Sequence, residues 1–222
     1  MKLYKFRALG SCEDLKRAQS ILETGEFWCS HFWELNDPME GVYLFKVGML
    51  TDEFIQNLYG QKTKHVICSF SGVNAFPNPI MWGYYANGFK GIAIEIEVDC
   101  RQQEIKKMTY AKEVLCITEH NDTANTVKRI LTTKLLCWQH EEEYRYLNKS
   151  SCTPQEIGKI TAVYFGSPYQ TTDNSADIQR QPQATKYLDH VNLLKQTAQA
   201  KGIQCHHVDI VDGLVQLANP NI

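Results

Sequence analysis

The order of apolar and polar residues along the chain predicts both helices and strands. Strand patterns, rich in β-branched and aromatic residues, occur at 2–7, 26–30, 64–71, 91–98, 143–148, 159–166 and 205–210. The clearest helical period covers 13–24, between Ser11 as a capping residue and Gly25 as a C-terminal stop. Further helices are expected at 51–59, 80–87, 122–137 and 184–201.

These elements do not follow a regular β-α-β alternation, and several connections suit antiparallel neighbours. The chain is therefore expected to form one α+β domain over residues 1–222, with a mixed or antiparallel core sheet flanked by helices. The polar stretch at about 168–184 is expected to form a mobile loop.

Composition narrows the class of protein. The chain has 222 residues with 43% hydrophobic and 22% charged residues, which is ordinary for a globular domain. A net charge of −2 without a basic block argues against nonspecific binding to duplex DNA. The sequence has neither an apolar run of about 20 residues nor a signal-like start, so a cytoplasmic protein without membrane contact is expected.

The eight cysteines are widely spaced and form no Cys-x-x-Cys pair, so neither a disulfide framework nor a structural metal is expected. Cys205-His206-His207 is a tight group of soft ligands. Adjacent strand residues point to opposite faces, so Cys205 and His207 alone could share a ligand set, and a closed zinc site needs four ligands. The role of this group stays open.

The segment from Trp138 to Arg145 is the strongest candidate site. On a strand, Glu141, Glu143 and Arg145 would project from one face, because side chains alternate with period two. Two carboxylates about 7 Å apart beside a guanidinium are typical of a functional site. An edge strand kept soluble by charge is the structural alternative.

Four further polar clusters could contribute to a site. Tyr4 and Arg7 lie on the first strand, where an arginine can bind a phosphate or merely face solvent. Ser69 and Ser71 share a strand face, and such serines often bond only to the backbone. The remaining clusters are the turn with Asn36, Asp37 and Glu40, which could be purely architectural, and the aromatic pair Trp82 and Tyr85, which could wall a pocket or pack in the core.

Several enzyme classes are disfavoured by absent motifs. The sequence lacks a Walker loop, a Gly-x-Gly-x-x-Gly turn after a strand, a Gly-x-Ser-x-Gly elbow and a His-Glu-x-x-His helix. These absences argue against an ATPase, a Rossmann dehydrogenase, a serine hydrolase and a zincin protease.

Taken together, the motifs resemble a widespread bacterial family of domains of unknown function. The blocks that carry the resemblance run from residue 3 to about 167: LYKFR, NDPxEG, CSFS, MWxxYA, KGIAI and WxxExEYR. This resemblance implies kinship but no activity.

A weaker resemblance to ADP-ribosyltransferases rests on the order Arg7, then Ser69 and Ser71, then Glu141-x-Glu143. It implies that NAD is the substrate, and that the protein is an NAD-dependent ADP-ribosyltransferase or NAD-cleaving protein, such as a defence or toxin effector. In that family pattern Arg7 would bind the phosphates, a serine would order the ribose, and Trp82 or Tyr85 would stack on nicotinamide. Tyr4 would belong to the same cofactor site.

The same resemblance implies roles for the two carboxylates. Glu143 would stabilise the positive charge on the sugar, because preorganised opposite charge lowers that barrier. Glu141 would position an acceptor, either protein or nucleic acid. The usual Ser-Thr-Ser triplet and a clear acceptor loop are missing from this sequence.

Two other functions remain open. In a metal-dependent nuclease or phosphoesterase, Asp37, Glu40, Glu141 and Glu143 would gather around Mg²⁺ or Mn²⁺, although Arg145 would repel the metal. In a non-catalytic binding module, the segment Glu141–Arg145 and the Asn-Asp-Pro turn would form a buried polar network that holds the fold.

Overall fold

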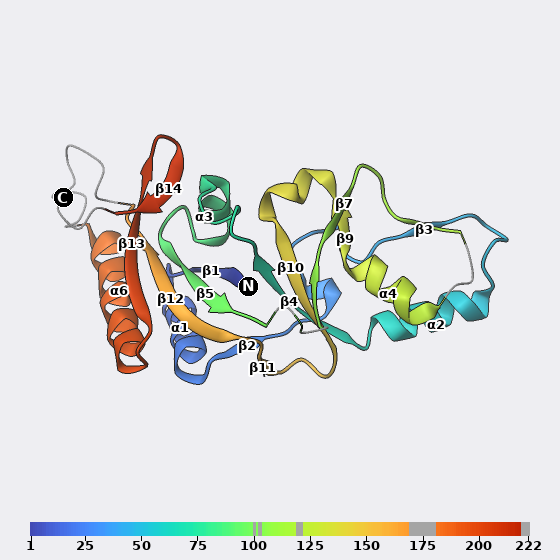
Figure 1. Cartoon of the computed structure of the whole chain (residues 1–222), viewed down its shortest axis with the longest axis horizontal. Coiled ribbons are helices and arrows are strands. Elements are labelled where there is room, and N and C mark those ends of the chain that lie inside the picture. Colours follow the sequence, from blue (N-terminus) through green and yellow to red (C-terminus); the bar gives the residue numbers. More distant parts are fainter. Residues whose placement is uncertain (100, 102–103, 119–121, 169–180, 219–222) are drawn as a thin grey trace. The chain divides into compact units, whose positions relative to one another are not determined.

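The computed structural model describes residues 1–99, 101, 104–118, 122–168 and 181–218. The chain has the expected α+β class, with helices and a mixed sheet that is accompanied by small two-stranded sheets (Figure 1). It forms two compact units. Unit 1 comprises Met1–Glu26, Ser71–Cys100 and Glu156–Ile222, and unit 2 comprises Phe27–Phe70 and Arg101–Gln155. Each unit is built from more than one segment of the chain.

Unit 1 contains a run of five hydrogen-bonded strands in the order β14-β13-β12-β5-β1. Their bounds are β1 Lys2–Ala8, β5 Gly91–Glu97, β12 Lys159–Gly166, β13 Gln204–Val211 and β14 Leu214–Leu217. Strand β5 runs antiparallel to both β1 and β12, whereas β12 and β13 are parallel. Parallel neighbours need a long crossover, which helix α6 (Pro182–Ala200) provides here.

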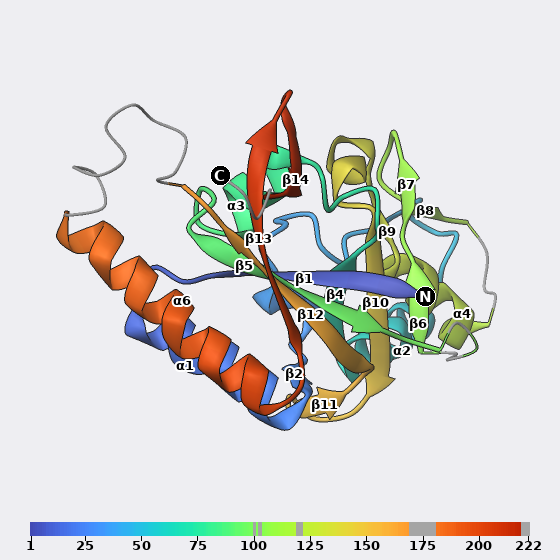
Figure 2. The same cartoon turned by 60° about the vertical axis from the view of Figure 1, so that its left-hand side comes forward.

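Two helices of unit 1 lie side by side against one face of these strands. Helix α1 (Cys12–Thr24) starts where Ser11 and Asp14 form a capping box and ends at Gly25, which has a left-handed φ of 76°. Its buried stripe is the one that the sequence predicted: Leu15, Ala18, Ile21 and Leu22. Figure 2 shows α1 and α6 running alongside each other.

The other face of these strands carries helix α3 (Pro79–Tyr85) and an aromatic core. Phe6 of β1 meets the ring of Trp82 edge-on, with centroids 5.3 Å apart. Because neighbouring strand residues point to opposite faces, Tyr4 and Phe6 lie on this face and Arg7 on the face opposite to it.

Unit 2 contains the strand order β4-β10-β6 together with smaller two-stranded sheets. The bounds are β4 His65–Ser71, whose last residue falls in unit 1, β10 Glu143–Lys149, β6 Ile105–Lys107, β3 Leu44–Phe45, β8 Cys116–Ile117, β7 Thr109–Ala111 and β9 Thr133–Leu135. Helices α2 (Asp52–Lys62) and α4 (Thr123–Leu131) pack together. Strands β2 (Glu26–Trp28) and β11 (Pro154–Glu156) form a further pair.

One predicted helix is shorter in the structure than the sequence indicated. The pattern over 122–137 predicted a single helix, but α4 ends at Leu131 and is followed by β9 and the 3₁₀ helix η2 (Leu136–Glu141). Two hydroxyl side chains, Thr132 and Thr133, bond back to carbonyls of the last turn, at 2.7 Å each. Such local bonds give the backbone an alternative to continuing the helix.

Some predicted features lie at the limits of the described residues. The loop expected at about 168–184 falls largely on residues 169–180, which lie outside the described part, and α6 already begins at Pro182. A second 3₁₀ helix, η1, covers Phe32–Glu34. None of the helices formed by the described residues is long and apolar enough to cross a bilayer.

Candidate functional site

Arg145 of β10 is the centre of the candidate site in unit 2. Its side chain is 1% exposed, and each of its N–H groups has a partner. Nη1 and Nη2 donate to the two oxygens of Glu40, at 2.5 and 2.6 Å. Nε and Nη2 donate to Glu143, at 2.7 and 3.2 Å, and Nη1 also donates to the Leu131 carbonyl at 2.7 Å. A guanidinium has five N–H donors, so the full donor set of Arg145 is used.

Glu40 reaches Arg145 from a turn whose own bonds set its shape. The Asp37 carboxylate accepts from the Met39 N–H at 2.9 Å, and the Glu40 N–H donates to the Asp37 carbonyl at 3.0 Å. Gly41 follows with a φ of +68°, and a Cβ there would lie 2.8 Å from the Phe32 ring. The Asn-Asp-Pro turn therefore aims Glu40, while Asp37 is buried and Asn36 is exposed.

Lys134 joins the two carboxylates that the sequence singled out. Its ammonium lies 2.6 Å from Glu141 Oε2 and 3.2 Å from Glu143 Oε2. The Lys134 side chain is 8% exposed, and its Nζ is 4.7 Å from the centroid of the Trp138 ring. Glu141 and Glu143 are each 4% exposed. The two carboxylates therefore share one buried cation.

The geometry that brings Glu141 and Glu143 together differs from the prediction. Both were expected on one strand face, but β10 begins at Glu143 and Glu141 ends the 3₁₀ helix η2. Glu142 separates them with a left-handed φ of 43°. Glu143 and Arg145 do share a strand face, as predicted, whereas Glu141 is placed by the helix and by its bond to Lys134.

Electrostatics hold the network in its charged form. Burial alone would raise the pKa of Glu143, but Arg145 and Lys134 overcome this and lower it to about 2. Burial alone would lower the pKa of Lys134, but Glu143 and Glu141 raise it above its ordinary value. The pKa of Arg145 is also raised, because Glu143 and Glu40 outweigh the burial that would lower it. All three groups are therefore ionised at neutral pH.

Two neutral groups complete the surroundings of Glu143. Ser69 on β4 hydrogen-bonds the Glu143 carboxylate and helps to lower its pKa. The Glu143 backbone N–H donates to the Tyr110 hydroxyl at 2.8 Å. Burial raises the pKa of Tyr110 above its ordinary range, so its phenol stays protonated. Ser69, Glu141 and Glu143, which the sequence named as site candidates, thus come together in unit 2.

A second buried lysine secures the same turn. Lys62 of α2 donates to the Gly41 carbonyl at 2.8 Å and is 6% exposed. Its Nζ also lies over the rings of Phe32, Tyr43 and Tyr59, at 4.3, 5.3 and 5.8 Å from the centroids. Burial lowers the pKa of Lys62, and Glu40 opposes that effect. Arg145 and Lys62 therefore anchor two consecutive residues of the turn.

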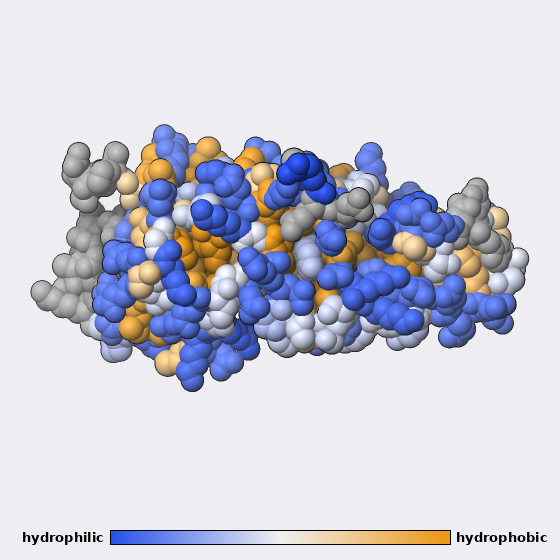
Figure 3. Space-filling model, turned by 60° about the horizontal axis from the view of Figure 1, so that its bottom comes forward, coloured by the Kyte–Doolittle hydropathy of each residue, from blue (hydrophilic) through white to orange (hydrophobic). Residues whose placement is uncertain are grey.

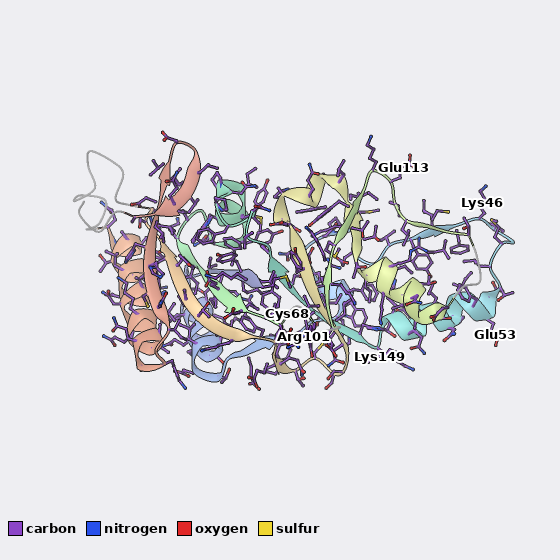
Figure 4. The ribbon with its side chains drawn as sticks, in the orientation of Figure 1. Lys46, Glu53, Cys68, Arg101, Glu113 and Lys149 are labelled. Carbon is purple, nitrogen blue, oxygen red and sulfur yellow. The ribbon has the colours of Figure 1, made fainter. Side chains whose placement is uncertain are left out.

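The segment that follows this turn exposes apolar side chains. These are Val42, Leu44, Phe45, Val47 and Met49, and Val47 is 97% exposed. Hydrophobic residues reach the surface at the end of unit 2 that carries β3 and α2 (Figure 3). Lys46 and Glu53 project outward there, whereas Cys68 lies among the strands (Figure 4). The anchored turn thus leads into an exposed apolar segment.

The remaining candidates from the sequence lie in unit 1, where Trp82 is a core residue. Its ring is fully buried against Phe6, Phe76 and Phe89, and its indole N–H donates to the Phe76 carbonyl at 2.9 Å. Tyr85 is half-buried at the edge of the same cluster. Trp82 therefore offers no ring face for stacking on nicotinamide.

Tyr4, Arg7 and Ser71 also belong to unit 1. The Tyr4 hydroxyl donates to Glu95, and Tyr4 is the register partner of Ser71. Arg7 lies on the opposite strand face from Tyr4 and from the Phe6–Trp82 contact, so the structure does not bring Arg7 together with them. Convergence of these residues with the carboxylates of unit 2 stays a prediction.

Three residues of the network were missed from the sequence: Lys62, Lys134 and Tyr110. Lys134 carried a usable signal, because it falls in the apolar register of Val127, Ile130 and Leu131. A lysine on the buried stripe of a helix is expected to pair with a buried carboxylate, because an unpaired buried charge is costly. Lys62 and Tyr110 had no comparable sequence signal, since their partners come from distant segments.

The described residues contain no group of three or more His, Cys, Asp or Glu side chains placed to hold a metal ion. Of the four carboxylates expected around Mg²⁺ or Mn²⁺, Glu40, Glu141 and Glu143 instead pair with Arg145 or Lys134, and Asp37 accepts from the Met39 N–H. Cys205 and His207 project from one face of β13 and His206 from the other, where its ring stacks on Tyr164. All described cysteines are free thiols.

Comparison with known proteins adds no relative to this picture. No family model matches the chain, and no curated protein sequence or solved structure matches it either. The resemblances to a bacterial family of unknown function and to ADP-ribosyltransferases therefore stay predictions that rest on the motifs.

Proposed function

We propose that this chain is a non-catalytic binding module in which the buried ion network is part of the architecture of unit 2. The observation that carries this proposal is the saturation of Arg145, whose five N–H donors are all bonded to Glu40, Glu143 and the Leu131 carbonyl. An arginine that recognises a substrate needs at least part of its fork available to that substrate.

The state of Glu143 supports the same proposal. Both of its oxygens accept from Arg145, and Lys134 and Ser69 contribute further bonds. A carboxylate that stabilises a cationic transition state must present its negative charge to the substrate. Here that charge is already matched by two buried cations.

The buried charges of the network are also paired. Each of the three buried carboxylates Glu40, Glu141 and Glu143 forms an ion pair with Arg145 or Lys134. Buried charges are costly unless they are paired and hydrogen-bonded. Buried charges that are paired with one another are what a structural network requires. The exposed apolar segment after the turn supports a binding role, since such surface is typical of interaction sites.

The second candidate function is NAD-dependent ADP-ribosyl transfer or NAD cleavage, with a protein or nucleic acid as acceptor. One observation favours it: Ser69 bonds to the ionised Glu143 carboxylate, and Glu141 shares Lys134 with Glu143, so the serine and both glutamates that the resemblance names lie together. In this candidate NAD is the substrate and the protein acts as a defence or toxin effector. The cytoplasmic location expected from the sequence belongs to both proposals.

The substitution Glu143→Gln separates the two candidates, with Glu142→Gln as the matched control one residue earlier. NAD consumption and urea unfolding are measured on the same samples. For a structural network, Glu143→Gln lowers the free energy of unfolding by about 3 kcal/mol, because Arg145 and Lys134 lose a buried partner, and no sample consumes NAD.

For an NAD-cleaving enzyme the pattern is reversed. The wild type and the Glu142→Gln control consume NAD, and Glu143→Gln loses at least ~100-fold in turnover while its unfolding changes little. That result would refute the binding-module proposal. Binding of Mn²⁺ that disappears in Glu143→Gln would instead favour the nuclease alternative.

A further inference from the structure

Glu95 of β5 is a buried carboxylate in unit 1 that belongs to none of the motifs above. It is 3% exposed and accepts four hydrogen bonds. The hydroxyls of Tyr4 and Tyr164 donate to Oε2, at 3.1 and 3.0 Å. Thr161 donates to Oε1 at 2.7 Å, and the Lys2 ammonium lies 3.0 Å from the same oxygen.

Three of these donors are held in place by the sheet. Tyr4 is the register partner of Glu95 on β1, and Tyr164 comes from the neighbouring strand β12. Thr161 lies at an irregularity of β12, between Ile160 and Ala162, and such bulges re-aim a side chain. The three hydroxyls are neutral donors, so they orient the carboxylate without cancelling its charge.

The carboxylate is nevertheless kept in its ionised form. Burial alone would raise the pKa of Glu95, but the bonds from Thr161, Lys2, Tyr164 and Tyr4 lower it. The phenols stay protonated, because burial and the nearby carboxylate raise the pKa of Tyr4 and of Tyr164. The cluster is therefore a fixed anion with fixed neutral donors.

Lys2 differs from the other three partners. Its side chain is 58% exposed, whereas the Glu95 side chain is 4% exposed. Ion pairs of an exposed lysine contribute little, since the ammonium is well solvated and its long side chain loses rotamer freedom. Lys2 is therefore the one partner of Glu95 that solvent or another cation can replace.

Aromatic rings surround the same place. Phe76 lies 4.6 Å from Tyr4 and 4.8 Å from Tyr164, measured between ring centroids, and the two tyrosines are 6.0 Å apart. Phe76 and Tyr164 are half-buried, so part of this aromatic surface reaches solvent.

We propose that Glu95 with Tyr4, Phe76, Thr161 and Tyr164 binds the alkylammonium group of a ligand, which replaces the Lys2 ammonium. The bonding pattern selects this class of cation. Oε2 already accepts from two phenols and Oε1 from Thr161, which leaves one acceptor position, the one that Lys2 fills. A guanidinium fork needs both oxygens of a carboxylate, whereas an ammonium needs one.

This site lies wholly in unit 1 and does not rest on the function proposed for unit 2. An NAD-cleaving activity in unit 2 would leave it unchanged. The amine-bearing ligands that fit this chemistry are small primary amines, polyamines or the lysine side chain of a peptide.

The test removes the internal competitor. The Lys2→Met variant and the wild type are titrated with n-butylammonium chloride at constant ionic strength, and binding is followed by amide chemical shifts of β1, β5 and β12. Lys16→Met is the matched control, because it removes the same charge from an exposed position of α1. Removing an occupant raises the fraction of open sites, so Lys2→Met is expected to bind on the order of tenfold tighter than the wild type and the control.

Three further probes complete the design. Butan-1-ol has the same chain without charge, guanidinium chloride has the charge with the wrong shape, and the double variant Lys2→Met/Glu95→Gln lacks the carboxylate. Neither butan-1-ol nor guanidinium chloride added to Lys2→Met, nor n-butylammonium added to the double variant, is expected to reproduce the chemical-shift changes. Equal affinity in Lys2→Met and wild type, no binding to either, or equally tight guanidinium binding would overturn the proposal. Since Lys2 is exposed, its variant is expected to fold.

Discussion

Two buried carboxylates, Glu143 in unit 2 and Glu95 in unit 1, are kept ionised in different ways. They are similarly buried, at 4% and 3% exposed. Glu143 is matched by Arg145 and Lys134, both of which are buried with it. Glu95 accepts from three hydroxyls and from a lysine whose side chain is 58% exposed.

The difference separates an architectural site from one suited to a ligand. In unit 2 Glu40, Glu141, Glu143, Lys134 and Arg145 are each paired with another buried charge, so removing one strands its partners. In unit 1 three neutral hydroxyls hold the Glu95 carboxylate and its cation partner Lys2 is exposed, so another cation can replace Lys2 while the three hydroxyl bonds stay in place. The two regions should therefore respond differently to substitution, acid and cations.

The largest expected effect is that of Arg145→Met. Glu40 and Glu143 would lose their main partner while remaining buried, which should lower the free energy of unfolding by about 4 kcal/mol. The four tryptophans allow each unit to be followed, because Trp28, Trp33 and Trp138 lie in unit 2 and Trp82 lies in unit 1. In fluorotryptophan-labelled Arg145→Met, the ¹⁹F NMR signals of Trp28, Trp33 and Trp138 should show unfolding of unit 2 at a lower urea concentration than in the wild type.

Arg17→Met is the control for this prediction. Arg17 pairs with Glu13 on the exposed face of α1, with side chains 65% and 69% exposed. An exposed i,i+4 pair contributes only about 0.3–0.5 kcal/mol, so all four signals should keep their wild-type midpoints. A comparable loss in Arg17→Met, or none in Arg145→Met, would contradict a structural role for the network.

The next effect is the response to acid. Glu143 has a pKa of about 2 in the folded protein against an ordinary value of 4.5. Its contribution to stability is therefore fully present above about pH 4.5 and is lost as the pH falls toward 2. As the pH is lowered from 5 to 3, the free energy of unfolding measured in urea should fall more steeply in the wild type than in Glu143→Gln. The difference in slope should be up to about 1.4 kcal/mol per pH unit. Parallel pH profiles of the two proteins would show that Glu143 is not held ionised.

The smallest effect is expected from Thr161→Val in unit 1. Valine has the shape of threonine but cannot donate the 2.7 Å bond to Glu95. Because the remaining donors are in place, the loss should be about 1 kcal/mol, seen in the Trp82 signal and not in those of unit 2. If Thr161→Val lowered the free energy of unfolding as much as Arg145→Met does, the Glu95 cluster would be as important for the stability of unit 1 as the ion network is for unit 2.

Much of the local structure could be predicted from the sequence. Helix α1 was readable from the Ser11 cap, the apolar stripe and Gly25, because these signals act within a few residues. Strands β1, β5 and β12 followed from runs of β-branched and aromatic residues. The end of α4 was missed, since Thr132 and Thr133 compete with the helix only through bonds visible in the structure.

The candidate site was predictable only in part. The sequence named Glu40, Glu141, Glu143 and Arg145, and these residues do come together. It misplaced Glu141 on a strand and did not find Lys62 or Lys134. Alternation along a strand gives the face of Glu143 and Arg145, but it cannot show which distant segment supplies their partners.

The sequence by itself determined the α+β class, the positions of most helices and strands, and the charged residues available to form a network. Only the tertiary structure decided that all five N–H groups of Arg145 would donate to acceptors within the chain, and that one partner of Glu95, Lys2, would be exposed. The physical reason is that capping and periodicity act over a few residues, whereas the pairing of a buried charge depends on residues up to 105 positions apart.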